Sequence, residues 1–273
     1  MATDYDAEHT MGQLLEALLA ADGVEQLTGL SIGQYDAEPF DKTPGDVAET
    51  MLANAAKLPA LRTLIWCDLA YEECEVSWIE NIELGPLLNT FPQLEHVLVR
   101  GGNNLGLSNL DLPELRTLII QTGGLDQSVI RQLEAAKLPK LTHLEIYFGA
   151  DEYGANCTPD DTARILSGEL FPGLTTLGLK NSEFVNEITQ AVIDSPLLPQ
   201  LKVLDLSLGV LQDAGAEPLA NNLPKLAHLD KLDLQHHFLS ESMQARLREL
   251  GDKVDLSEAE EPDEDYFFVA IGE

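Results

Sequence analysis

Two segments of the sequence, 68–78 and 147–157, concentrate side chains that could bind or transform a ligand. The candidates in them are Glu72, Glu73, Tyr147, Asp151 and Tyr153. Carboxylates that line a pocket and have shifted pKa values would indicate an enzyme, whereas an exposed acidic rim would indicate binding of a partner. In the structural alternative, Trp78 and Phe148 fill gaps in the core and explain the length of both segments.

The cysteine and histidine side chains give little support for catalysis or metal binding. Glutamates flank Cys74 and raise the pKa of its thiol, which makes it a poor nucleophile. With Cys67 and Cys157 it makes an odd number without a C-x-x-C pair, so no disulfide framework is expected. His236 and His237 lack metal-ligand spacing, and the common phosphate-binding, nucleophile and zinc-protease motifs are absent. We expect no enzyme, metal or cofactor.

The net charge of the chain limits the classes of partner that it can bind. Sixteen basic residues against 47 acidic ones give a net charge of −31. Such a surface repels nucleic acids and anionic lipids but attracts a protein with a basic surface, although the charge could serve solubility alone. No stretch approaches the roughly 20 apolar residues that cross a bilayer, and the acidic start is unlike a signal peptide. We therefore expect a cytoplasmic protein that binds neither nucleic acid nor membranes.

The elements that position the candidate residues follow a repeated pattern, L-x-x-L-x-L, with Val, Ile or Trp at some of the later positions. It begins at Leu27, Leu61, Leu94, Leu115, Leu141, Leu174, Leu201 and Leu229. Alternate residues of a strand point to opposite faces, so the apolar positions would point inward. The pattern is typical of a leucine-rich-repeat solenoid, an α/β fold with a curved parallel sheet on the concave side and helices on the convex side.

Helices are expected between most of these strands. The candidates are 45–56, 127–136, 159–170, 184–194, 214–221 and 240–250. The step of 21 residues from Leu94 to Leu115 leaves no room for a full helix, so 105–111 should cross irregularly. The domain organisation would be an N-terminal helical cap at 1–23, a leucine-rich-repeat domain at 24–256, and an acidic loop with a C-terminal capping strand at 257–273.

The outward-facing strand residues divide into an apolar and an acidic group. The apolar group is Ile65, Leu98 and Ile119, and the acidic group is Glu145, Asp205 and Asp233. An apolar anchor beside a charge that sets orientation is what a protein-binding face needs. Arg100 and Tyr147 add residue types that are frequent at interface hot spots. Loops that fold back over the apolar group and bury it are the structural alternative.

Several segments together resemble a family of uncharacterised bacterial cytosolic leucine-rich-repeat proteins. They are Tyr71–Ile79, Val99–Asn103, Leu204–Gly209, Leu234–Ser240, Val254–Ser257 and Phe268–Glu273. The segment Asp213–Ala220 resembles the helical half of ribonuclease-inhibitor-like repeats. The resemblance runs from about Val24 to the end, and it implies the fold but no activity, cofactor or catalytic residue.

The sequence thus predicts a non-enzymatic scaffold that recognises a partner protein through its concave face and adjoining loops. Two alternatives stay open. One is an enzyme with a carboxylate-lined site in the 68–78 and 147–157 loops. The other is an inhibitor that masks a basic enzyme, by analogy with ribonuclease inhibitors.

Overall fold

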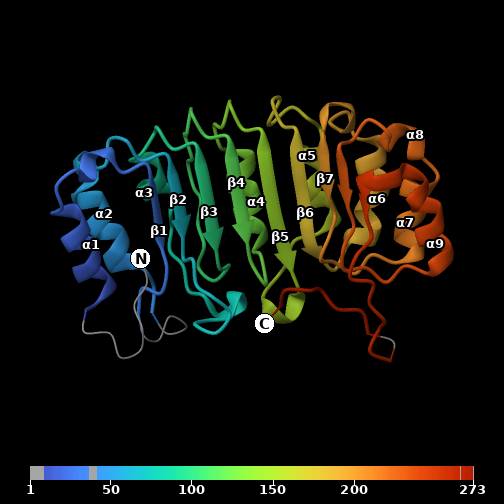
Figure 1. The fold of residues 1–273 in the computed structure, drawn as a ribbon, viewed down its shortest axis with the longest axis horizontal. Helices are drawn as coiled ribbons and strands as arrows, with labels where there is room; N and C mark the ends of the chain where they lie inside the picture. Colours follow the sequence, from blue (N-terminus) through green and yellow to red (C-terminus); the bar gives the residue numbers. More distant parts are fainter. Residues whose placement is uncertain (1–8, 37–41, 265, 273) are drawn as a thin grey trace. The chain divides into compact units, whose positions relative to one another are not determined.

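Figure 1 shows the computed structural model, which describes residues 9–36, 42–264 and 266–272. The chain divides into two compact units. The first comprises Met1–Thr122 and Ser128–Leu141, and the second comprises Gly123–Gln127 and Thr142–Gly272. The cap, repeat domain and tail expected from the sequence stay a prediction. Residues 1–8 of that cap and residues 265 and 273 of that tail lie outside the described part.

The strands of the first unit are parallel and follow one another in sequence order. They are β1 (Gly29–Ile32), β2 (Thr63–Trp66), β3 (His96–Arg100) and β4 (Thr117–Gln121). The register aligns the second apolar position of each repeat, which is Leu30, Leu64, Val97 and Leu118. All four are buried, so the phase of the L-x-x-L-x-L repeat sets the register of the strands.

Helices and one irregular crossing lie before, between and after these strands. Helix α1 (Met11–Leu19) buries one apolar face, as its spacing predicts. Thr10 caps it, because its hydroxyl accepts from the Gln13 N–H and its own N–H donates to the Gln13 side chain. The other helices are α2 (Gly45–Ala53), α3 (Gly85–Asn89) and α4 (Gln127–Glu134). No helix forms at 105–111, which confirms the irregular crossing expected there.

The strands of the second unit are also parallel and in sequence order. They are β5 (His143–Gly149), β6 (Thr176–Ser182), β7 (Val203–Asp205), β8 (Lys231–Asp233) and β9 (Val254–Asp255). The short strand β9 pairs with β8, which confirms the strand expected at 254–256. The aligned apolar positions of β5 to β8 are Leu144, Leu177, Leu204 and Leu232, and all are buried.

The helices of the second unit are α5 (Ala163–Leu166), α6 (Val185–Asp194), α7 (Asp213–Ala220), α8 (Leu223–Leu226) and α9 (Glu241–Leu247). Helix α5 is shorter than the helix expected at 159–170, because Pro159 opens a 3₁₀ turn before it. Parallel strands on L-x-x-L-x-L cores thus alternate with helices or irregular crossings in both units. This confirms the leucine-rich-repeat solenoid class.

None of the helices in the described residues is both long enough and apolar enough to span a bilayer.

The C-terminal segment 266–272 does not form the capping strand expected there. It runs along the carboxyl ends of the strands of the second unit, in red in Figure 1. Individual hydrogen bonds hold this segment, and it does not pair with a strand. The buried Asn181 accepts from the Ile271 N–H at 2.9 Å and donates to the Ile271 carbonyl. The Ala270 N–H donates to the Leu208 carbonyl at 2.9 Å.

We expect Asn181→Ala to release this segment. Two net hydrogen bonds of about 1 kcal/mol each are lost, which would speed amide exchange at Ile271 roughly 30-fold. Hydrogen exchange read by mass spectrometry on the C-terminal peptide measures the change. Gln190→Ala, which removes an exposed bond within α6 to Asp194, is the control and should leave that peptide unchanged. Equal protection of the C-terminal peptide in Asn181→Ala would show that other contacts hold it.

Candidate partner-binding site

Ile65, Leu98 and Ile119, called the apolar row from here, lie side by side on three adjacent strands of the first unit. The register pairs Ile65 with Leu98 and Leu98 with Ile119. All three are half-buried. The residues before and after each of them along its strand are buried on the opposite face. Thr63 and His96 hold the next outward positions. The described loops of the unit therefore leave this row partly open.

Arg100 does not project from this face as a free anchor. Its Nη1 donates to the Leu69 carbonyl at the start of the 68–78 loop. Its Nε is buried and has no hydrogen-bond partner in the described part of the chain. Arg100 therefore fixes the loop to the end of β3, and this contact reduces what it can offer to a partner.

The acidic group of the second unit is paired with lysines. Lys180 on β6 lies 2.6 Å from the Asp205 carboxylate and 3.6 Å from that of Glu145. Lys231 on β8 lies 2.6 Å from the Asp233 carboxylate. The sequence interpretation treats these three carboxylates as open charges. In the structure they form a ladder of ion pairs, so this face presents much less negative charge than their number suggests.

Neighbouring groups fix the protonation states of Lys180 and Glu145 in this ladder. Burial opposes the charge on Lys180, but the charge of Asp205 and its hydrogen bond raise the pKa of the lysine above its ordinary value. Burial also opposes the charge on Glu145, yet the hydrogen bond with His143 and the charge of Lys180 hold the pKa of that carboxyl below its usual range. Lys180 and Glu145 are therefore both charged at neutral pH.

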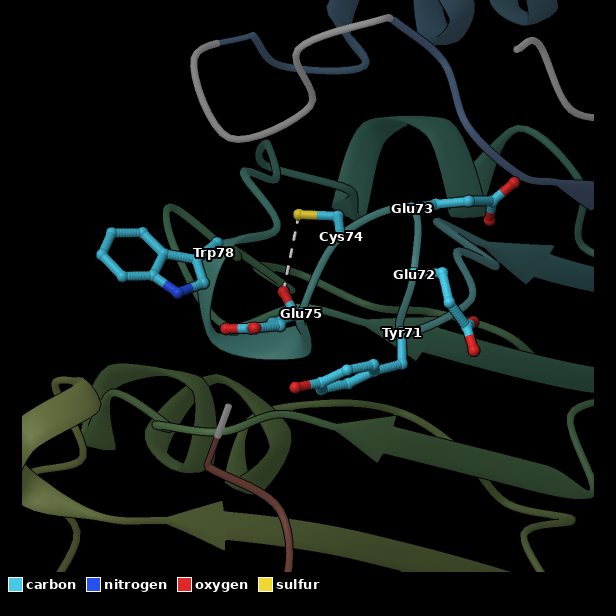
Figure 2. A pocket seen from close by; sticks show the side chains of 6 residues that line it. All are labelled: Tyr71, Glu72, Glu73, Cys74, Glu75 and Trp78. Carbon is cyan, nitrogen blue, oxygen red and sulfur yellow. Dashed lines mark hydrogen bonds between the residues drawn. The ribbon is translucent and has the colours of Figure 1, made fainter. Parts of the chain in front are cut away.

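The 68–78 loop of the first unit forms a pocket of about 400 Å³ (Figure 2). It is lined by Tyr71, Glu72, Glu73, Cys74, Glu75 and Trp78. The side chains of Tyr71 and Trp78 are 62% and 56% exposed. The interpretation of Trp78 as a core residue is therefore wrong, because the neighbouring Val76 and Ile79 fill the interior instead. For Phe148, by contrast, packing is confirmed, since it is fully buried against Phe184.

The chemistry of this pocket is unlike that of a nucleophilic active site. Burial and the charge of Glu75 raise the pKa of the Cys74 thiol to about 11, so it is protonated at neutral pH. The Glu73 carboxylate accepts from the Ala70 N–H at 2.6 Å and closes its own turn. Glu72 is exposed.

The 147–157 loop of the second unit is partly covered. Tyr147 is only 9% exposed, and the Lys180 ammonium lies 5.0 Å from its ring centre. Tyr153 lies against the backbone of Gly272, where an added Cβ would meet its ring at 2.6 Å. Asp151 is exposed, and its N–H donates to the Glu183 carboxylate at 2.9 Å. The C-terminal segment thus occupies part of the rim expected here.

His237 has a structural role. It is fully buried, its Nδ1 accepts from the Leu239 N–H at 3.2 Å, and its Nε2 lies 3.3 Å from the Leu256 carbonyl. Burial lowers the pKa of its imidazole. Across the described ranges, no group of three or more His, Cys, Asp and Glu side chains is placed to hold a metal ion.

The strand and repeat geometry defines a leucine-rich-repeat protein. No protein-family model and no curated protein matches the chain. A protein of Bacteroides fragilis, solved as a structural-genomics target, is 31% identical, and the match covers 95% of this chain and 73% of that one with a TM-score of 0.89. The chain belongs to the same family as this Bacteroides protein.

More distant similarities are found to an internalin of Listeria monocytogenes and to a leucine-rich-repeat protein of Leptospira interrogans. The internalin is 15% identical over 77% of this chain and 57% of its own, with a TM-score of 0.37. The Leptospira protein is 15% identical over 95% of this chain and 54% of its own, with a TM-score of 0.40. Bacterial origin, cytosolic location and ribonuclease-inhibitor-like repeats stay predictions.

Proposed function

We propose that the protein is a non-enzymatic scaffold that binds a partner protein through the concave face of its sheet and the adjoining loops. The observation that supports this best is the apolar row. Three aliphatic side chains on adjacent strands are only half-buried, so part of each stays open to water. A partner that covers them removes apolar surface from water, at roughly 25 cal/mol per Å².

Electrostatics favours a partner with a basic surface and disfavours nucleic acids and membranes. The net charge of −31 creates a field that speeds the approach of a basic protein. The ion-paired Glu145, Asp205 and Asp233 contribute little to this field. Exposed acidic groups such as Glu72 and Asp151 therefore carry more of the steering. The cytoplasmic location expected from the sequence is part of the same proposal.

The two alternatives have weaker support. An enzyme in the 68–78 loop would need a reactive group, and the Cys74 thiol is protonated at neutral pH. An inhibitor of a basic enzyme is a special case of the scaffold, and only the analogy with other leucine-rich-repeat proteins favours it.

A charge at the centre of the apolar row should abolish this function. We expect Leu98→Glu to weaken partner binding at least 30-fold, about 2 kcal/mol, because a carboxylate would be buried against an apolar surface of the partner. The protein is used as bait in an extract of its own cells, and retained proteins are quantified by mass spectrometry at low and high salt.

The control is Leu52→Glu, the same substitution at a 39% exposed leucine on α2. It should retain the partner as the wild type does. A partner that binds Leu98→Glu and the wild type equally would refute recognition through the apolar row. A partner lost from both variants would indicate that added charge alone repels it, which also counts against the row.

A further inference from the structure

Two aromatic rings of the 68–78 loop stand out of the protein surface around one carboxylate. Tyr71 and Trp78 are among the few large apolar side chains that are more than half exposed in the described residues. Figure 2 shows the Glu75 carboxylate between the Tyr71 ring and the Trp78 indole, on the same side of the loop. Glu72 points to the other side.

The Glu75 carboxylate makes no hydrogen bond or ion pair with any residue that the structure describes, in contrast to Glu73 and to the acidic group of the second unit. Its backbone is fixed, because its carbonyl accepts a weak hydrogen bond from the Cys74 thiol at 3.5 Å. Between its two aromatic rings, the pocket thus offers a carboxylate that has no partner among the described residues.

The loop that carries these groups is held at both ends. Leu69 is buried at its start, and Arg100 binds the Leu69 carbonyl. Val76 and Ile79 are buried on either side of Trp78. The rings are therefore presented by an anchored loop, which lowers the entropy lost when a ligand orders them. The loop follows directly after β2, which carries Ile65 of the apolar row.

We propose that this pocket binds one arginine side chain of the partner protein, an inference that rests on the proposed function of protein binding. A guanidinium stacks on aromatic faces and donates two parallel hydrogen bonds to a carboxylate, and an ammonium does both less well. Trp78 and Tyr71 supply the faces, and Glu75 supplies the carboxylate. The net charge of −31 favours a cationic occupant of the pocket over any other.

The test uses the full chain and N-acetyl-arginine amide as the probe, with N-acetyl-citrulline amide as its uncharged isostere, at about 150 mM salt to screen the general field of the protein. The chain has two tryptophans. Trp66 is buried and its indole N–H donates to Asn81 at 3.0 Å, so its NMR signal reports on folding. The indole N–H signal of Trp78 reports on the pocket.

We expect the arginine probe to shift the Trp78 signal alone, with a dissociation constant on the order of 10 mM, and the citrulline probe to bind at least tenfold more weakly. Glu75→Gln should weaken the arginine probe about tenfold. Glu16→Gln removes the same charge from an exposed position on α1, outside the pocket, and should change nothing.

Equal shifts with citrulline, or unchanged binding in Glu75→Gln, would overturn the inference. Tighter binding of N-acetyl-lysine amide would also overturn it, because the occupant would then be an ammonium. None of these results tests binding through the apolar row, which Leu98→Glu tests separately. Loss of partner binding in Leu98→Glu with no response to the arginine probe would keep the scaffold and remove the pocket.

Discussion

Replacement of Gly149 by alanine should destabilise the second unit by roughly 3 to 5 kcal/mol. Gly149 ends β5 with φ of 78°, a conformation that side chains rarely adopt. An added Cβ would also lie 1.8 Å from the Gly123 carbonyl oxygen, which is backbone and cannot move aside. The Ala150 N–H donates to that same carbonyl, so the clash breaks the contact that closes the turn.

The matched control is Gly154→Ala, five residues further along. Its φ is 89°, but nothing lies within 4 Å of the added Cβ. Only the backbone cost of about 1 kcal/mol is expected there. Both tryptophans, Trp66 and Trp78, lie in the first unit, so unfolding of the second unit is better followed by hydrogen exchange of peptides from 142–264 in urea. Equal stability of the two variants would show that the turn at Gly149 relaxes.

The strands could be predicted because side chains alternate between the two faces of a strand, and this period of two residues determines which residues are buried. Leucines at alternate positions must reach the same interior, and a slip of one residue would expose every one of them. The aligned Leu64, Val97 and Leu118 illustrate this. The C-terminal segment was not predictable in the same way. Tyr266 to Ile271 has the apolar composition of a strand, but Asn181, some 90 residues earlier, takes both backbone groups of Ile271.

The net charge of the outward face of the second unit could not be predicted from the strand positions alone. The sequence places Glu145, Asp205 and Asp233 at equivalent outward positions of their strands, and the register confirms that Asp205 pairs with Asp233. The lysines that neutralise them stand two residues away along the strands. One signal was available: Gly178 lies beside Glu145 in the register, and a Cβ there would come within 2.9 Å of the Glu145 Cγ and 3.2 Å of the Lys180 Cδ. A glycine at position 178 leaves room for the ion pair between Glu145 and Lys180.

The sequence predicts that the 68–78 loop is a candidate site, but it does not predict how the side chains of the pocket are arranged. The length and the acidic composition of the loop mark it as a candidate. Which aromatic residue is exposed depends on which neighbours reach the interior, and Val76 and Ile79 do so in place of Trp78. Local sequence does not decide between these arrangements, because each of them buries an apolar side chain. The role of Glu75, which no repeat position marks, follows only from the folded loop.

Removal of Lys180 should lower the free energy of unfolding of the second unit, because two carboxylates lose the cation that pairs with them. The side chains of Lys180 and Asp205 are only 13% and 12% exposed, so Lys180→Met leaves Asp205 and Glu145 without their cation in a poorly hydrated place. We expect a loss of about 2 to 4 kcal/mol at pH 7, because breaking one side of a buried pair strands the other charge. Urea unfolding followed by hydrogen exchange of peptides from the second unit measures it.

The pH dependence identifies the cause. The pKa of Glu145 is lowered in the folded protein, so its contribution is present above its unfolded pKa of about 4.3 and is lost as pH falls through the folded value. In Lys180→Met the lysine charge that stabilises the Glu145 carboxylate is missing, so the difference in the free energy of unfolding from wild type should narrow as pH falls below about 4.3. Lys140→Met removes an exposed pair with Glu114 and should change stability little at either pH. A gap for Lys180→Met that stays constant with pH would instead attribute the loss to the packing of its methylene chain.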